Sequence, residues 1–248
     1  MALTDNLISV WEMDEASGDA VDSHGSNTLT ETSGTIAATT GKINGARDFE
    51  ATGDSEYFEI ADNADVSIGD TDWTISAWVY GETLASNPVI ASKGWSNTPD
   101  ANSEFVLWYS TSTSRFRVDM RGSSTTTSAI ANNHGVAYAG NWYHVVAWHD
   151  SVNNVIGIAI NAGTANTTAK TDGVNDGTAS FIVGSSPSQS LYWDGLIDQV
   201  AIWRRVLTSD ERTSLYNSGS GLAYSSFGGG GGSSTGLWYY HHQQRVVS

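Results

Sequence analysis

Residues 193–203, WDGLIDQVAIW, predict a long strand that leads directly into a short helix. Ile197, Val200, Ile202 and Trp203 supply the apolar side chains of a half-buried strand. The polar run that follows, LTSDE at 207–211, has the composition of a helix start. One strand followed by one helix is therefore expected near the end of the chain.

The helix start is predicted at Thr208 or Ser209, because either hydroxyl can accept a hydrogen bond from the free backbone amides of the first turn. The acidic side chains at 210 and 211 are favourable at that positive helix end. Leu215 and Tyr216 are expected to face the sheet, and the glycines at 219 and 221 to end the helix.

The rest of the chain is rich in predicted strands. It has 248 residues with 10 Trp, 10 Tyr and 6 Phe but only 3 Pro, which suits many short strands around one large core. We expect an all-β sandwich of two sheets with one short helix near the C-terminus. The strands are expected at Leu7–Met13, Tyr57–Ile60, Trp73–Tyr80, Val89–Ser92, Glu104–Tyr109, Arg115–Met120, Trp142–His149, Val155–Asn161, Ala179–Gly184 and Leu191–Trp203.

Composition excludes several classes of protein. The formal net charge of -16, from 11 Lys+Arg against 27 Asp+Glu, argues against a nucleic-acid partner, since phosphate binding needs a basic surface. The chain has no Cys, which rules out disulfides, thiolate metal sites and a thiol nucleophile. No apolar run approaches the roughly 20 residues that span a membrane. Residues 1–5 lead into the first strand without a secretion signal, which indicates synthesis in a cytoplasm.

The composition changes abruptly near the C-terminus. We expect a domain at 1–227, a flexible Gly/Ser linker at 228–234 and an aromatic tail at 235–248. The tail cannot bury its own apolar side chains, so it is predicted to dock on another subunit and drive assembly into a trimer or higher oligomer, or attachment to a capsid protein. The alternative is a disordered or artificial extension. The assembly residues would be Trp238, Tyr239, Tyr240, Val246 and Val247.

Five motifs in the expected order resemble the laminin-G-like, concanavalin A-like jelly rolls, a family of lectins and glucanases. The resemblance spans residues 5–223 and implies the same two-sheet jelly roll, with the strand and helix at 193–216 as its closing element. The motifs are WEMDEASG at 11–18, NWYHVVA at 141–147, GIAINAG at 157–163, FIVG at 181–184 and WDGLID at 193–198.

The resemblance also implies a structural Ca²⁺ ion between the loop after the first strand and the last long strand. Its oxygen ligands would be Asp22, the carbonyl of Asn27 and Asp198. The alternative is that Asp22 caps a turn and Asp198 accepts backbone hydrogen bonds.

Catalysis is not expected. Glucanases of this fold carry three carboxylates on one face of a strand, at every second residue. Here Glu12 and Asp14 would share a face, but Glu15 falls on the other, so the triplet is incomplete. Trp142, His144 and Trp148 are expected to pack in the core rather than to form a sugar platform. His241 and His242 are adjacent, so a strand would point them apart and prevent chelation.

Glycan recognition is expected from loop residues in two groups. Trp95 offers an aromatic platform beside Asp100 and Asn102. The second group is polar and comprises Arg121, Asn132, Asn133 and His134. Polar loops of this kind are also what any β-sandwich exposes.

The function expected from these features is non-catalytic binding by a displayed module. The first hypothesis is a surface protein of a phage virion, either a capsid decoration subunit or an adhesin, anchored by its tail. Such proteins are assembled in a cytoplasm and need no export signal. The alternative is an extracellular carbohydrate-binding module from a secreted bacterial enzyme or adhesin.

Overall fold

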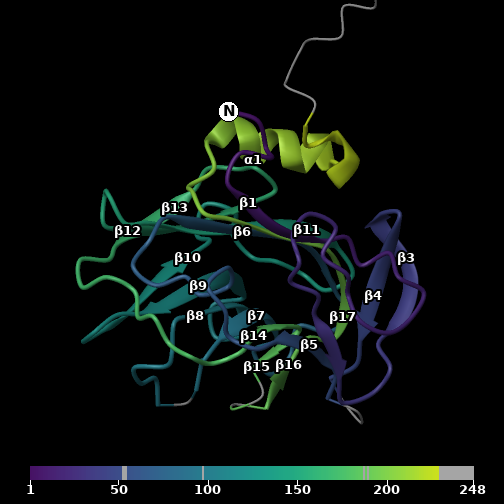
Figure 1. Cartoon of the computed structure of the whole chain (residues 1–248), viewed down its shortest axis with the longest axis horizontal. Coiled ribbons are helices and arrows are strands. Elements are labelled where there is room, and N and C mark those ends of the chain that lie inside the picture. The colour runs from purple at the N-terminus through teal and green to yellow at the C-terminus, as the bar shows by residue number, and fades with distance from the viewer. Residues whose placement is uncertain (52–54, 97, 187, 189, 229–248) are drawn as a thin grey trace, which may run out of the picture.

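The structure of the protein is a computed structural model that describes residues 1–228 apart from 52–54, 97, 187 and 189. Two antiparallel sheets stack face to face, and helix α1 lies on the outer face of one of them (Figure 1). The predicted all-β two-sheet sandwich is thus confirmed. The predicted linker beyond Gly228 and the tail with its five assembly residues lie outside the described residues.

The first sheet has eight strands and is called the eight-stranded sheet. Its order is β13-β12-β11-β6-β17-β4-β3. β1 pairs with the C-terminal part of β17, beyond the residues that pair with β4. The strands are β1 (Leu7–Trp11), β3 (Ala37–Ile43), β4 (Gly45–Phe49), β6 (Trp73–Gly81), β11 (Trp142–Asp150), β12 (Val155–Ile160), β13 (Asn166–Ala169) and β17 (Gly195–Trp203).

The second sheet is called the seven-stranded sheet, and its order is β10-β9-β8-β7-β14-β5-β2. A two-stranded hairpin of β15 and β16 flanks it (Figure 1). The strands are β2 (Thr30–Thr32), β5 (Tyr57–Ile60), β7 (Val89–Lys93), β8 (Phe105–Ser110), β9 (Arg115–Arg121), β10 (Thr126–Ile130), β14 (Phe181–Val183), β15 (Ser185–Ser186) and β16 (Leu191–Tyr192).

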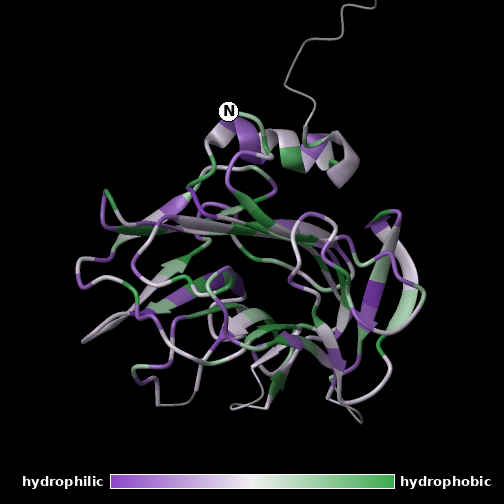
Figure 2. Cartoon of the chain, viewed as in Figure 1, coloured by the Kyte–Doolittle hydropathy of each residue, from purple (hydrophilic) through white to green (hydrophobic). Residues whose placement is uncertain are grey.

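The core lies between the two sheets, where alternate side chains of facing strands meet. Both layers carry recurring apolar positions (Figure 2). Trp11 stacks on Phe181 with ring centroids 5.5 Å apart, and Phe105 packs against both Trp73 and Phe181. The Trp11–Phe181 and Trp73–Phe105 contacts join the eight-stranded sheet to the seven-stranded one.

The closing helix begins as the sequence predicts. Helix α1 (Ser209–Tyr216) has Thr208 as its N-cap, and Thr208 and Glu211 form a reciprocal capping box. Its C-cap is Asn217, which adopts the left-handed conformation expected there of a glycine. Two single-turn helices follow, η2 (Asn217–Gly219) and η3 (Tyr224–Ser226). No helix of the described residues is long and apolar enough to cross a membrane.

A second apolar cluster fixes the helix and both ends of the described chain to the eight-stranded sheet. It joins Leu3, Trp203, Leu215 and Phe227. The indole of Trp203 donates to the carbonyl of Leu3 (2.6 Å), and its ring stacks on Phe227 at 6.1 Å between centroids. The outer face of this sheet is therefore covered by the helix and the N-terminal segment.

The strand predicted at Leu191–Trp203 is divided in two. β16 ends at Tyr192, and β17 begins at Gly195, whose φ of +123° lies in a region that favours glycine. A side chain at Gly195 would meet the carbonyl of Tyr80 at 2.3 Å, so the glycine also allows β17 to pack against β6.

Candidate functional site

The candidate site lies on the outer face of the seven-stranded sheet. Ile182 of β14 is paired with Glu59 of β5 on one side and with Ser92 of β7 on the other. Residues opposite each other in an antiparallel pair share a face, so these three side chains form one row. Their neighbours Phe58 and Phe181 belong to the core, which places the row on the outside.

A pocket of about 230 Å³ opens above this row. One wall comes from Gly94 and Trp95, directly after β7, and another from Ala179 and Ser180, before β14. Tyr57, two residues before Glu59, also lines the pocket. The pocket therefore combines aromatic rings, a carboxylate and hydroxyl groups, which is the mixture that holds a small polar ligand.

Trp95 is held firmly against the sheet. Its side chain is 8% exposed and packs with Val89 and Val106, which lie on the outer face of β7 and β8. The hydroxyl of Ser186 in β15 donates to the backbone carbonyl of Trp95 (3.1 Å). This packing fixes the indole at the pocket edge before any ligand arrives.

The electrostatics of the pocket favour a neutral phenol beside an acid. Burial raises the pKa of Tyr57, and the charge of Glu59 raises it further. A tyrosine phenol is protonated at neutral pH, and the raised pKa extends this to higher pH, so the phenol can donate a hydrogen bond while the Glu59 side chain accepts one. This pairing can serve a ligand that both donates and accepts hydrogen bonds, such as a sugar hydroxyl.

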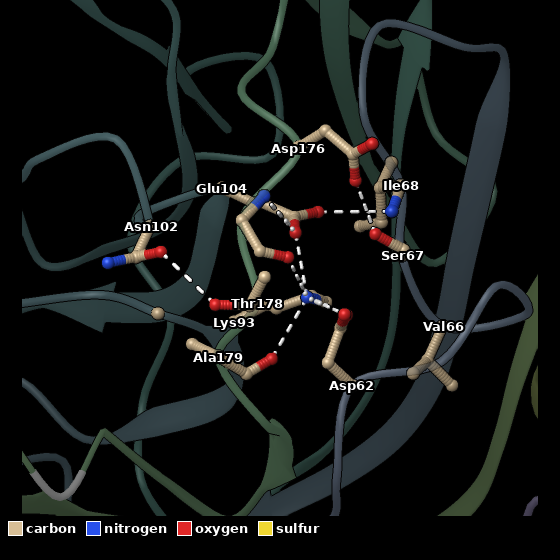
Figure 3. Close-up of polar contacts among 12 residues, drawn as sticks. Asp62, Val66, Ser67, Ile68, Lys93, Asn102, Glu104, Asp176, Thr178 and Ala179 are labelled. Atoms are coloured by element: carbon tan, nitrogen blue, oxygen red, sulfur yellow. Dashed lines mark hydrogen bonds and ion pairs between the residues drawn. The ribbon is translucent and has the colours of Figure 1, made fainter.

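The wall at 177–180 is anchored from below by Lys93, whose side chain is fully buried (Figure 3). Its ammonium donates to the carbonyls of Gly177 (3.0 Å) and Ala179 (2.9 Å). It also forms ion pairs with Asp62 (2.7 Å) and with the buried Glu104 (2.7 Å). Ser92 and Gly94, on either side of Lys93 in the chain, line the pocket. Lys93 therefore connects the strand under the pocket to the wall at 177–180.

Glu104 completes this anchor. Its two oxygens accept from the backbone amides of Gly177 and Ile68, each at 3.0 Å (Figure 3). Burial raises the pKa of Glu104, and the hydrogen bond and charge of Lys93 partly offset this. The pair holds segments from three parts of the chain and is satisfied at both ends, as a buried ion pair must be.

The first predicted glycan group is only partly brought together at the pocket. Trp95 lines it, whereas Asp100 and Asn102 close their own loop: Asp100 Oδ1 accepts from the Asn102 amide (2.8 Å). Asn175 donates to the carbonyl of Asp100 (2.9 Å) and Thr178 to the Asn102 side chain (3.4 Å). These two residues thus support the neighbouring 175–179 segment.

The second predicted glycan group is not one cluster. Arg121 pairs with Thr126 at one end of the β9–β10 hairpin, while Asn132 follows β10 at the other end. Five strand residues separate them, roughly 17 Å at about 3.3 Å each. Sequence order suggested proximity, but the antiparallel register separates Arg121 from the other three. Near the second end, Asn133 is bonded to residues 165 and 166, and His134 packs on Tyr143.

The predicted Ca²⁺ ligands have protein partners of their own. Asp22 accepts from the backbone amides of Val10, His24, Gly25 and Asn27, and the carbonyl of Asn27 accepts from the indole of Trp11 (2.6 Å). Burial would raise the pKa of Asp22, but the hydrogen bonds from the Gly25, Asn27 and Val10 amides lower it. This is the geometry of the turn-capping alternative, and the Ca²⁺ site stays a prediction.

Asp198, the third predicted Ca²⁺ ligand, is fully buried and has different hydrogen-bond partners from Asp22. One oxygen accepts from the Ile43 amide (2.7 Å), and the other is buried with no hydrogen-bond partner. Burial, and to a lesser degree the charge of Asp14, raise the pKa of Asp198 to about 8. In the described part of the chain, no group of three or more His, Asp or Glu side chains is placed to hold a metal ion.

The three carboxylates considered as a glucanase motif, Glu12, Asp14 and Glu15, do not lie on a strand. β1 ends at Trp11, and Met13 has a φ of +62°, so the chain turns before the third acid. Asp14 accepts from the Gly45 amide (2.7 Å) and Glu15 from the Val21 amide (2.7 Å). Both carboxylates accept hydrogen bonds from the protein's own backbone.

The aromatic face of β11 packs against helix α1 rather than between the sheets. The His144 ring packs at a tilt against Trp78 (centroids 5.0 Å apart) and stacks on Tyr216 (6.3 Å), and its Nε2 forms a hydrogen bond with the Ser76 hydroxyl (2.7 Å). Arg212 lies over Trp148 at 4.6 Å. His144 and Trp148 are buried as expected, but in the layer under the helix, while Trp142 is partly exposed.

Comparison with known proteins places the fold in a family. The laminin-G-type family model described as the Concanavalin A-like lectin/glucanases superfamily matches residues 52–211, more than half of the chain. The chain belongs to this superfamily. The resemblance inferred from the sequence motifs is thus confirmed. No curated protein matches this concanavalin A-like chain in sequence.

Solved structures share the concanavalin A-like fold at low sequence identity. One is domain 4 of an extracellular GH43 arabinanase from Geobacillus stearothermophilus in complex with arabinotriose, with a TM-score of 0.66, 20% identity, and coverage of 84% of this chain and 97% of that one. Another is the binding domain of Paraclostridial Mosquitocidal Protein 1, with a TM-score of 0.68, 16% identity and coverage of 87% and 53%.

The botulinum neurotoxin serotype G binding domain is similar too, with a TM-score of 0.65, 16% identity and coverage of 85% and 50%. This chain spans about half the length of the two toxin binding domains. At these identities the likeness shows the fold alone. The chain is a concanavalin A-like domain.

Proposed function

We propose that this protein is a non-catalytic carbohydrate-binding module that holds a sugar residue in the pocket above Glu59, Ile182 and Ser92. The observation that carries the proposal is the pocket itself, which Trp95, Tyr57 and Glu59 line together. An aromatic ring packs against the apolar face of a sugar, and the polar groups pair with its hydroxyls.

The size and construction of the pocket support a small polar ligand. Its volume of about 230 Å³ lies just below the range of drug-sized sites, which suits one sugar residue of a longer glycan. The anchor at Lys93 holds the wall in place, so little ordering is left for binding to drive. The likeness to an arabinanase domain crystallised with arabinotriose makes arabinotriose the first probe to try.

The virion-surface hypothesis depends on the C-terminal tail. Its anchoring and oligomerisation rest on Trp238, Tyr239, Tyr240, Val246 and Val247, which lie outside the described residues, and the comparisons lend it no support. The features of the described chain favour the carbohydrate-binding alternative. Virion surface or extracellular location stays a prediction.

The test is isothermal titration calorimetry with arabinotriose and a panel of other neutral oligosaccharides. At least one is expected to bind the whole protein, and Tyr57→Ala and Glu59→Gln are expected to weaken that binding at least tenfold. The control is Glu12→Gln, the same charge change outside the pocket, which should bind like the parent. Binding unchanged by both pocket variants, or no binding across the panel, would contradict the proposal.

A further inference from the structure

A row of partly exposed apolar side chains crosses the outer face of the eight-stranded sheet. Leu196 of β17 is paired with Tyr80 of β6, and Tyr80 is paired with Trp142 of β11. The three therefore lie side by side on one face, at about 4.8 Å between strands. Trp78, two residues before Tyr80, stacks on Tyr216 of α1, so this is the helix-bearing face.

Helix α1 covers the neighbouring row but leaves this one open. Trp78 is 2% exposed under the helix, whereas Leu196, Tyr80 and Trp142 are all partly exposed. The rings of Tyr80 and Trp142 lie 5.7 Å apart between centroids and are tilted by 50°. We call Leu196, Tyr80 and Trp142 the aromatic row. It is separate from the pocket, which opens on the other sheet.

Acidic side chains border one end of the aromatic row. Asp48 of β4 is paired with Leu196, so it extends the row by one strand. Burial, followed by the charges of Glu82, Glu50 and Asp194, raises the pKa of the Asp48 carboxyl to about 6. One Asp48 oxygen is buried without a hydrogen-bond partner. Like charges thus gather here at a cost that an external cation would relieve.

Among the residues that the structure describes, no basic side chain forms an ion pair with this acidic group of Asp48, Glu50, Glu82 and Asp194. The adjacent row shows that rings on this face can receive an ammonium group, because the Lys42 Nζ lies 5.1 Å from the Trp78 ring centre. The aromatic row offers the same face to an ammonium from outside.

We infer that the aromatic row and its acidic border form a second glycan-binding surface, specific for a cationic amino-sugar polymer such as a glucosamine oligomer. The pyranose rings pack on Tyr80 and Trp142, and the sugar ammonium groups pair with Asp48 and its acidic neighbours. Asp48 and Tyr80 are two strands apart, roughly 10 Å, so the ligand has to be an oligosaccharide. The inference rests on the proposed class of ligand but uses a different surface.

The test compares two probes by calorimetry at neutral pH and low salt: the glucosamine hexamer and its fully N-acetylated counterpart, which lacks the charges. The glucosamine hexamer is expected to bind, and the acetylated one to bind at least tenfold more weakly. Asp48→Asn and Trp142→Ala should each weaken binding of the glucosamine hexamer about tenfold. Asp48→Asn removes an unfavourable charge and should fold normally, which keeps the test decisive if Trp142→Ala is unstable.

Two controls separate this inference from others. Glu12→Gln, a matched loss of one charge outside both the pocket and the aromatic row, should leave binding of the glucosamine hexamer unchanged. Hexalysine measures attraction to any acidic surface. Equal loss for Glu12→Gln and Asp48→Asn, hexalysine binding as tightly as the sugar, or no binding of the glucosamine hexamer would overturn the inference. None of these outcomes alters the pocket test with neutral sugars.

Discussion

At the scale of single residues, buried charges hold this protein's loops in place. Lys93 and Arg47 are both fully buried. Arg47 donates to the carbonyls of Ile36 and Gly18 and pairs with Glu31 at 2.7 Å. Such groups are costly to bury alone but hold several loop segments at once when fully bonded. Sequence patterns cannot reveal them, since a Lys or Arg in a strand predicts an exposed face.

The Lys93–Glu104 pair gives a prediction that separates stability from binding. Lys93→Met should destabilise the protein by about 3–5 kcal/mol, because Glu104 is left buried without its cation. Lys93→Met with Glu104→Leu should recover much of that loss in urea denaturation. Glycan affinity should stay low in the double variant, because the carbonyls of Gly177 and Ala179 have lost their donor. Recovery of both properties would mean that the pair does not position the pocket wall.

Asp198 predicts how stability changes with pH. Its pKa is about 8 in the folded protein and roughly 3.9 when unfolded, so the folded state binds an extra proton between these values. That stabilising contribution is complete below about pH 4 and is lost as pH rises through 8. In EDTA, Asp198 should lower the melting temperature of the parent as the pH rises from 5 to 8. Asp198→Asn should remove this contribution to the fall in melting temperature.

Binding of Ca²⁺ at Asp198 would change the melting temperature in the opposite direction. If the ion binds there, millimolar Ca²⁺ should raise the melting temperature of the parent at pH 8 but not that of Asp198→Asn. A hundredfold excess over Kd corresponds to about 2.7 kcal/mol. An unchanged melt in EDTA and Ca²⁺ for the parent would remove the predicted Ca²⁺ site, including its proposed contributions from Asp22 and Asn27.

At the scale of elements, strands with apolar alternation were predictable, and polar edge strands were not. β6, β8, β9, β11 and β12 agree with their predicted positions to within about two residues. β3 (AATTGKI) and β13 (NTTA) are largely exposed and carry no such alternation. They are strands because a neighbour's free backbone groups pair with them, a tertiary effect that local sequence does not encode.

Most residues of the candidate pocket could not be predicted from the sequence, because strand pairing brings them together. Trp95 was predicted as an aromatic platform because a lone Trp in a polar loop is conspicuous. Glu59, Ser92 and Ile182 are far apart in sequence, and only the register of β5, β14 and β7 brings them together. The local signal at each is merely one outward residue of a short strand.

The capping box of α1 gives a prediction at this scale. Thr208→Ala should cost about 1 kcal/mol of unfolding free energy, since the Glu211 amide loses its acceptor (3.3 Å) and Glu211 Oε2 loses a donor (3.1 Å). Thr213→Ala, at an exposed position of the same helix, should change stability by less than about 0.5 kcal/mol. Equal effects in chemical denaturation would show that the box does not support the helix.

At the scale of the whole molecule, the two ends of the described chain meet on one sheet. Leu3 and Phe227 join the same apolar cluster around Trp203. The family motifs end before this point, and the family model covers only 52–211, yet the packing extends well beyond it at both ends. The folding unit is thus larger than the part that the family match recognises.

A truncation series tests that boundary. Residues 1–228 should melt cooperatively and close to the temperature of the full chain. Ending the chain at residue 222 removes Phe227, which is 1% exposed, and should destabilise the fold by about 3–5 kcal/mol, the usual cost of losing a buried Phe. Indistinguishable melts for the two truncated chains would contradict the role given to Phe227.

The most direct measurement of glycan binding in the pocket is a two-dimensional NMR titration that follows the indole N–H signals, assigned by substitution. On addition of a neutral oligosaccharide that binds in calorimetry, the Trp95 signal should shift in proportion to occupancy. The signals of Trp11 and Trp203 should stay fixed, because their indoles donate to the buried carbonyls of Asn27 and Leu3. A bound sugar that leaves the Trp95 signal unmoved would contradict the pocket assignment.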